Sequence, residues 1–276
     1  MAENDYKEKP DLATASKYID QILEKIGQNP EDKTQLISLS EKAYQISKDN
    51  KIASKQRGFL FSLIKEDYTN QKTPSRILEL ANQMQAIKRP GTANILYKSL
   101  MDNFSGSEEA RIAKTKLDPG VSDLNNYIIN IGEGITQGEV DKFGINRNAA
   151  LKYVDACEAY ALAYPSTPEA PANLYKAAEI AKTIRTFPKL MSIYDWIIEK
   201  YPNYEKTPTI FFLKGFVLEN DLGNDEEAKK IYEAFIEKFP NHGLRDDIDF
   251  LLEHLGKSEE EIRKIIEAKQ KENVKE

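Results

Sequence analysis

The feature that most constrains the fold is a helix-end signature that recurs at nearly constant spacing. An aromatic residue followed by proline occurs at Tyr164-Pro165, Tyr201-Pro202 and Phe239-Pro240, and the prolines are 37 and 38 residues apart. An aromatic ring can close the apolar face of a helix, and the proline cannot continue the helical hydrogen-bond ladder. Repetition at about 20–50 residues is typical of repeat arrays. The chain is therefore expected to consist of repeated supersecondary units.

The residues before each closing proline follow one template. Small or apolar side chains stand 12, 8 and 5 residues before the proline, a spacing that places them on one helical stripe. They are Ala228, Tyr232 and Phe235; Leu190, Tyr194 and Ile197; and Tyr153, Cys157 and Tyr160. A fourth window fits before Ser105, with Ala93, Tyr97 and Leu100 followed by Phe104.

Two of these closing helices have a predicted partner helix before them. The partners span residues 172–184 and 208–220, and small residues such as Ala178 and Gly215 lie on their apolar stripes. Small side chains let a second helix approach closely, so we expect Ala178 and Gly215 at the contact between the two helices of a unit. Helix, short turn, helix and proline then form one repeat.

This unit resembles the tetratricopeptide repeat, an antiparallel helix pair of about 34 residues with small packing residues and a closing proline. Residues 171–204 fit its length without a gap, and residues 208–241 fit with one inserted residue. Residues 143–256 are more closely similar to envelope-associated tetratricopeptide proteins of Gram-negative bacteria, of the outer-membrane assembly lipoprotein and periplasmic cell-division coordinator types. The matching segments are 148–150, 156–160, 194–202, 213–216 and 251–256.

The resemblance implies an all-α fold, a right-handed α-solenoid of tetratricopeptide-like helix hairpins. In the N-terminal half, three-and-four spacing of apolar residues predicts helices near 11–27, 31–48, 51–69, 74–88, 91–104 and 107–117. The predicted segments are a flexible tail over 1–10, a helical half with degenerate repeats over 11–117, an irregular connection with a helix over 118–147, the repeat array over 148–256, and a charged C-terminal helix and tail over 257–276.

Charge and hydropathy exclude several classes of protein. The net charge of -6 does not favour nucleic-acid binding. The longest apolar run has six residues, far fewer than the roughly 20 of a membrane-spanning helix. The charge is uneven: residues 219–253 carry a net charge of -7 (eleven acids, four bases) and residues 48–89 one of +5 (nine bases, four acids). These charges either are solvated helix faces or steer partners of opposite sign.

No set of residues predicts catalysis or metal binding. The glycine-rich stretch 132–138 lacks the strand and the Lys-Ser/Thr pair of a phosphate-binding loop. Cys157, the single cysteine, occupies a packing position, and both histidines, His242 and His254, are more than 80 residues away in sequence. The sequence therefore predicts no catalytic residue, no metal site and no cofactor, although a helical enzyme remains an alternative class.

The predicted functional surface is the inner face of the first helices, which in the resembling family lines a concave groove. By that register the lining residues are Tyr175, Glu179, Lys182, Phe212, Phe216 and Glu219. The alternative is that these rings are ordinary core. Large rings on a nominally exposed face favour a partner, so the predicted function is a non-catalytic scaffold that binds protein or peptide segments.

The location of the protein is predicted from the resemblance alone. It implies a periplasmic or outer-membrane-associated protein. Residues 1–10 are polar throughout and show no export signal, so this location would require a signal, with or without a lipid anchor, on an N-terminus that has been removed. A cytoplasmic adaptor with the same groove is the alternative.

Overall fold

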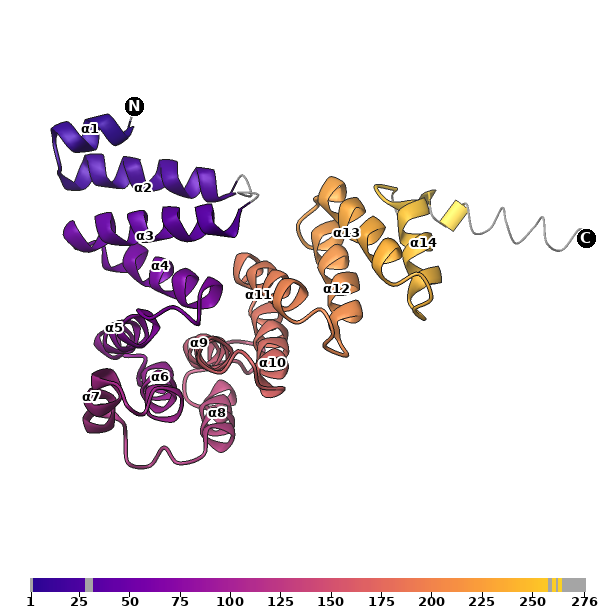
Figure 1. The fold of residues 1–276 in the computed structure, drawn as a ribbon. Helices are drawn as coiled ribbons and strands as arrows, with labels where there is room; N and C mark the ends of the chain where they lie inside the picture. The colour runs from indigo at the N-terminus through magenta and orange to yellow at the C-terminus, as the bar shows by residue number, and fades with distance from the viewer. Residues whose placement is uncertain (1, 28–31, 258–259, 262, 265–276) are drawn as a thin grey trace, which may run out of the picture. The chain divides into compact units, whose positions relative to one another are not determined.

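A computed structural model describes residues 2–27, 32–257, 260–261 and 263–264. All regular structure within these residues is helical, and no strand occurs among them (Figure 1). The chain divides into two compact units, Met1–Ile180 and Ala181–Glu276, and the division falls within helix α10 (Glu169–Thr183). This confirms the prediction of an all-α fold built from helix hairpins. The charged helix expected over 257–276 lies largely outside the described residues.

The first unit contains nine α-helices and one 3-10 turn among its described residues, before α10 begins. In chain order these are α1 (Ala2–Glu8), α2 (Leu12–Gly27), α3 (Lys33–Asp49), α4 (Ala53–Glu66), α5 (Thr73–Ala86), α6 (Pro90–Asn103), α7 (Glu108–Lys116), α8 (Leu124–Glu133), η1 (Gly134–Thr136) and α9 (Arg147–Ala163). Helices α2 to α7 begin and end within three residues of the predicted bounds. The hairpins α3/α4 and α5/α6 are its most closely packed pairs.

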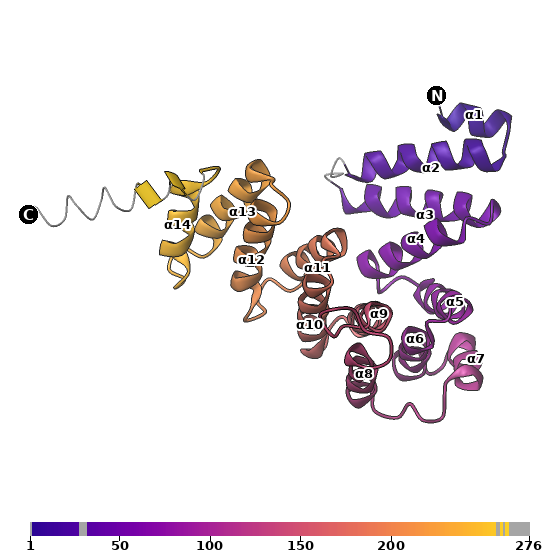
Figure 2. The ribbon, with the colours of Figure 1, turned by 180° about the vertical axis from the view of Figure 1, so that it is seen from behind.

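Helix α9 does not simply extend the row of hairpins in the first unit. It packs against α6 and also touches α4, and it lies beside α6 in both views (Figures 1 and 2). Arg89 Nε lies 3.0 Å from the Asp155 carboxylate at one end of this contact. At the other end the carbonyl of Ala163 accepts hydrogen bonds from Tyr68 Oη and Asn103 Nδ2. Polar contacts between residues far apart in sequence therefore hold α9 at its middle and at its C-terminal end.

The N-terminal segment differs from the prediction. Residues 1–10 were expected to form a flexible tail, but Ala2–Glu8 form helix α1, which packs on α2. Glu3 pairs with Lys42 of α3 at 3.0 Å, and Asn50 Nδ2 donates a hydrogen bond to Tyr6 Oη. Partners that are 39 and 44 residues away stabilise this short helix, and a local reading of a polar decapeptide does not reveal them.

The second unit consists, in its described part, of the end of α10, α11 (Phe187–Lys200), α12 (Thr207–Asn220), α13 (Asp225–Lys238) and α14 (Arg245–His254), with α12 and α13 as its closest hairpin. The aromatic residues of the recurring signature cap the helices as expected. Tyr201 and Phe239 are the C-caps of α11 and α13, and each backbone N–H donates to the carbonyl four residues earlier. Tyr164 and Phe104 do the same for α9 and α6 in the first unit.

The closest approach in the second unit is between Gly215 of α12 and Tyr232 of α13. A Cβ atom at Gly215 would overlap the Tyr232 ring and would lie 2.7 Å from its Cδ1 atom. Tyr232 is fully buried, and Phe235 and Ala228 of α13 lie in the same core cluster as Phe211 of α12. The prediction that Gly215 lies where the two helices of one repeat touch is therefore confirmed. Ala178 of α10 is also buried.

We expect Gly215→Ala to destabilise the protein by about 1–3 kcal/mol, because the added methyl group must displace the Tyr232 ring in a packed core. Gly58→Ala is the matched control: Gly58 lies inside α4 with no atom within 4 Å of an added Cβ. That change should stabilise the protein by roughly 0.5–1 kcal/mol, because alanine favours a helix interior over glycine. Denaturant unfolding of both variants measures the difference, and equal stability of the two would contradict this helix packing.

Cys157 of α9 is fully buried, and burial raises the pKa of its thiol to about 12. Because the thiolate is the reactive form, native protein at pH 8 should react with iodoacetamide far more slowly than unfolded protein. Ser166→Cys in a Cys157→Ser background supplies an exposed thiol as the control. Equal labelling rates for Cys157 and the control thiol would show that Cys157 is not a core residue.

Candidate partner-binding face

Helix α12 is apolar on more than one side. One side faces the core with Ile210, Phe211 and Leu218, and Gly215 meets α13 there. Another side carries Phe212 and Phe216, which are only half-buried. A helix that is apolar on most of its surface is expected to be buried on most of it, by the rest of the chain or by a partner. Phe212 and Phe216 are therefore the candidate contact residues of this helix.

The two half-buried rings of α12 form an ordered pair. The ring centroids of Phe212 and Phe216 are 6.1 Å apart with an interplanar angle of 27°. The ammonium group of Lys182, near the end of α10, lies 5.9 Å from the centroid of Phe216, within range of a cation–π attraction. Phe212 also packs against the core cluster on its inner edge, whereas Phe216 does not. The outward part of this pair is a preformed apolar surface with one cation at its edge.

Glu219 lies one turn beyond Phe216 on α12 and has a structural role. Tyr232 Oη donates a 2.9 Å hydrogen bond to the Glu219 carboxylate. Burial and this carboxylate raise the pKa of Tyr232 above its ordinary value, so the phenol remains protonated and remains a donor. Glu219 thus ties the outer face of α12 to the α12/α13 packing, and it keeps further acceptor capacity for a partner.

Two ion pairs flank the α12 face within the second unit. Lys214 of α12 pairs with Asp195 of α11. Arg185, in the turn after α10, lies 3.5 Å from Asp221 at the end of α12. These pairs neutralise the charges of Lys214, Asp195, Arg185 and Asp221 next to the Phe212/Phe216 pair.

The six residues predicted to line the groove divide between the two units. Lys182, Phe212, Phe216 and Glu219 belong to the second unit. Ring and cation–π contacts connect Lys182, Phe216 and Phe212, whereas Glu219 contacts Tyr232. Tyr175 and Glu179 of α10 belong to the first unit, where Tyr175 is half-buried and Glu179 is exposed. Burial and the nearby charge of Glu179 raise the pKa of Tyr175. Tyr175, Phe212 and Phe216 are all more exposed than the packing residues Tyr194, Tyr232 and Phe235, which is the order that the repeat register predicts.

Phe250 on α14 is a candidate contact residue that the sequence reading missed. It lies 38 residues after Phe212, the same distance that separates Pro202 from Pro240. The turns before α12 and α14 have matching hydrogen bonds, from Thr207 N to Tyr204 O and from Arg245 N to His242 O. Extending the proline spacing by one repeat would have identified Phe250, which is 43% exposed.

The first unit presents a different surface between α3 and α5, the first helices of its two closest hairpins. Glu41 of α3 pairs with Arg76 and Lys72 of α5. Glu79 of α5 accepts hydrogen bonds from Tyr44 and Lys48 of α3. The charges here are satisfied within the chain, and no exposed aromatic pair comparable to Phe212/Phe216 accompanies them in the described residues.

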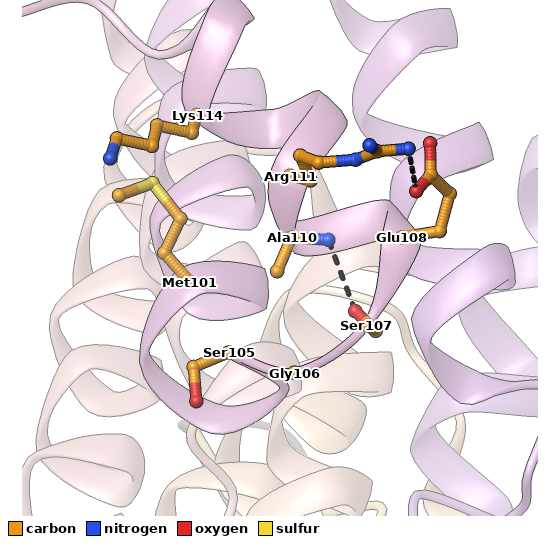
Figure 3. Close-up of a pocket in the computed structure, with 8 residues that line it drawn as sticks. All are labelled: Met101, Ser105, Gly106, Ser107, Glu108, Ala110, Arg111 and Lys114. Atoms are coloured by element: carbon orange, nitrogen blue, oxygen red, sulfur yellow. Dashed lines mark hydrogen bonds and ion pairs between the residues drawn. The ribbon is translucent and has the colours of Figure 1, made fainter.

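Two of the pockets in the first unit are lined by residues that do not form a catalytic or metal-binding set. The larger, of about 440 Å³, lies at the start of α7 (Figure 3). Its Ser107 hydroxyl accepts a hydrogen bond from Ala110 N, and Arg111 pairs with Glu108, so these polar groups already have partners. The smaller, of about 280 Å³, lies between α2, α3 and α4 and is lined by apolar residues, serines and Lys55, which pairs with Asp20.

Within the part of the chain that the structure describes, no three His, Cys, Asp or Glu side chains are arranged to hold a metal ion. None of the described helices is both long enough and apolar enough to span a bilayer.

A tetratricopeptide repeat family model matches residues 210–242, which contain most of α12 and all of α13. The search of curated proteins returned no match to the chain. The match coincides with the hairpin in which Gly215 packs on Tyr232 and in which Phe212 and Phe216 are half-buried. Residues 210–242 therefore match a tetratricopeptide repeat, and Phe212, Phe216 and Glu219 of the candidate partner-binding face lie within them.

Proposed function

We propose that this protein is a non-catalytic scaffold that binds segments of other proteins on the face of the second unit formed by Lys182, Phe212, Phe216 and Glu219. The observation that carries the proposal is the Phe212/Phe216 pair: two stacked, half-buried rings on a helix whose opposite side is already fully packed. Tetratricopeptide repeats commonly serve as protein-binding scaffolds, which supports the same assignment.

The chemistry of the face suits a protein segment. Rigid aromatic rings are typical anchors of protein interfaces, since they bury a large area at low cost in conformational entropy. The Phe212 ring is held from behind by the core, and Phe216 is held by Phe212 and Lys182. Glu219 offers acceptor atoms for a backbone N–H group at the edge of the rings. A segment with apolar side chains and free backbone donors matches this arrangement.

A location in the bacterial envelope is the second part of the proposal. Its support is the resemblance of residues 143–256 to envelope-associated tetratricopeptide proteins, and the alternative is a cytoplasmic adaptor with the same binding face. Fractionation of the source cells, with an antibody against this chain, tests it. Recovery with the periplasmic or outer-membrane fraction agrees with the proposal, whereas recovery with the cytoplasm favours the alternative.

Replacing Phe212 and Phe216 together by alanine should weaken partner binding by more than about 2 kcal/mol, because anchor residues at the centre of an interface commonly contribute that much. The immobilised chain captures partners from envelope and cytoplasmic extracts, and the affinity for each recovered partner is then measured. Phe216→Ala alone keeps the core contact of Phe212 and separates binding from folding.

Phe143→Ala is the matched control, since Phe143 is 74% exposed in the connection before α9 of the first unit and lies outside the proposed face. It should bind like the wild type. Identical partners and affinities for the wild type and the Phe212/Phe216 variant would show that these rings are ordinary core.

A further inference from the structure

We propose that the binding face continues onto α14 and that its partner is a basic segment, in which a lysine or arginine side chain docks on Phe250 and neighbouring apolar side chains dock on Phe212 and Phe216. This inference rests on the proposed function and names the chemistry of the partner.

Helix α14 repeats the residue positions of α12. Ile210 of α12 and Ile248 of α14 are both fully buried and stand 38 residues apart. The same shift carries Phe212 to Phe250 and Phe216 to His254. Equivalent positions on successive first helices of a repeat array face the same side. Phe250 and His254 therefore repeat, on α14, the pair that Phe212 and Phe216 form on α12.

Phe250 and His254 form an ordered pair on α14. The rings of Phe250 and His254 stack with centroids 4.2 Å apart and an interplanar angle of 28°. His254 is buried, and its Nδ1 hydrogen-bonds to the carbonyl of Phe250 at 2.7 Å. This stacking and hydrogen bond hold Phe250 in place, although its ring is 43% exposed. Leu222 and Phe250 are the only large apolar side chains this exposed within the described part of the second unit.

Acidic side chains lie next to Phe250 on α14. Residues three and four positions apart are neighbours on a helix surface, so Asp246, Asp247 and Glu253 surround Phe250 on α14. All three are exposed, and Asp246 and Asp247 form no ion pair with any residue that the structure describes. An exposed aromatic ring among carboxylates attracts a cation both through the ring and through the acids. The net charge of -7 over residues 219–253 extends the same field, which steers a basic partner.

Charge is also distributed unequally along the proposed face. Lys182 lies at the α10 edge of Phe216, whereas the unpaired acids lie on α14. Asp249 is already paired with Arg245 at 2.8 Å, so it does not contribute to the attraction. The basic residues of the partner are therefore expected at α14 and its apolar residues at α12.

The test measures fluorescence anisotropy of two short labelled peptides with the full chain. One contains leucine, lysine and serine, and the other has glutamate in place of every lysine. The lysine peptide should bind more tightly than the glutamate peptide, and its affinity should fall as salt rises, because salt screens exposed charges. Phe250→Ala should raise the Kd of the lysine peptide about tenfold.

Asp246→Asn with Asp247→Asn should also weaken the lysine peptide and should reduce its salt dependence. The matched control is Glu226→Gln with Glu237→Gln, which removes the same charge from exposed positions on α13 and should raise Kd less than the aspartate pair does, because these acids are not neighbours of Phe250 on α14. Because Asp246 and Asp247 lie in the first turn of α14, thermal unfolding of each variant is measured, and Phe250→Ala tests the inference without changing that turn.

Equal affinity for the two peptides, or no binding of either, would overturn the inference. If Phe216→Ala abolishes binding of captured partners while Phe250→Ala and the aspartate variant do not, the proposed function stands and the extension onto α14 is wrong. If neither set of variants changes partner binding, the face itself is not the binding site.

Discussion

The close approach of α12 and α13 determines the geometry of the second unit. Gly215 has no side chain, so the Tyr232 ring packs directly on the α12 backbone. This contact determines the rotation of α12 about its axis, and Phe212 and Phe216 consequently remain half-exposed. The hydrogen bond from Tyr232 to Glu219 reinforces the same rotation from the outer side. A larger residue at position 215 would move the helices apart and would change the direction in which both rings point.

The two units use their first helices differently. In the first unit, α3 and α5 join through Glu41, Arg76 and Glu79, whose charges pair within the chain. In the second unit, α12 and α14 present partly exposed aromatic rings, and Asp246 and Asp247, within about one turn of Phe250, form no ion pair with any residue that the structure describes. Polar groups that are satisfied internally gain little from a partner, whereas exposed rings and unpaired charges gain from burial and neutralisation. This contrast is the physical reason to place partner binding in the second unit.

Local sequence patterns predicted most of the helices and the packing of the repeat. The aromatic-proline signature marked the C-caps at Tyr164, Tyr201 and Phe239, and the small residue Gly215 marked the tightest contact. Helix α1 and the position of α9 were not predictable in the same way, because they depend on contacts between distant residues, such as Glu3 with Lys42 and Arg89 with Asp155. Phe250 could have been predicted by applying the 38-residue spacing once more, from Phe212 on α12 to α14. The binding role of the predicted face remains a prediction, since it depends on a partner.

Partner binding on the face formed by α12 and α14 can be tested by titrating isotope-labelled full-length protein with the lysine-containing peptide and following the change in each backbone amide resonance. We expect the shifted resonances to cluster on α12 and α14, around Phe212, Phe216 and Phe250. Shifts concentrated on α3 and α5, or on the outer side of α13, would contradict it.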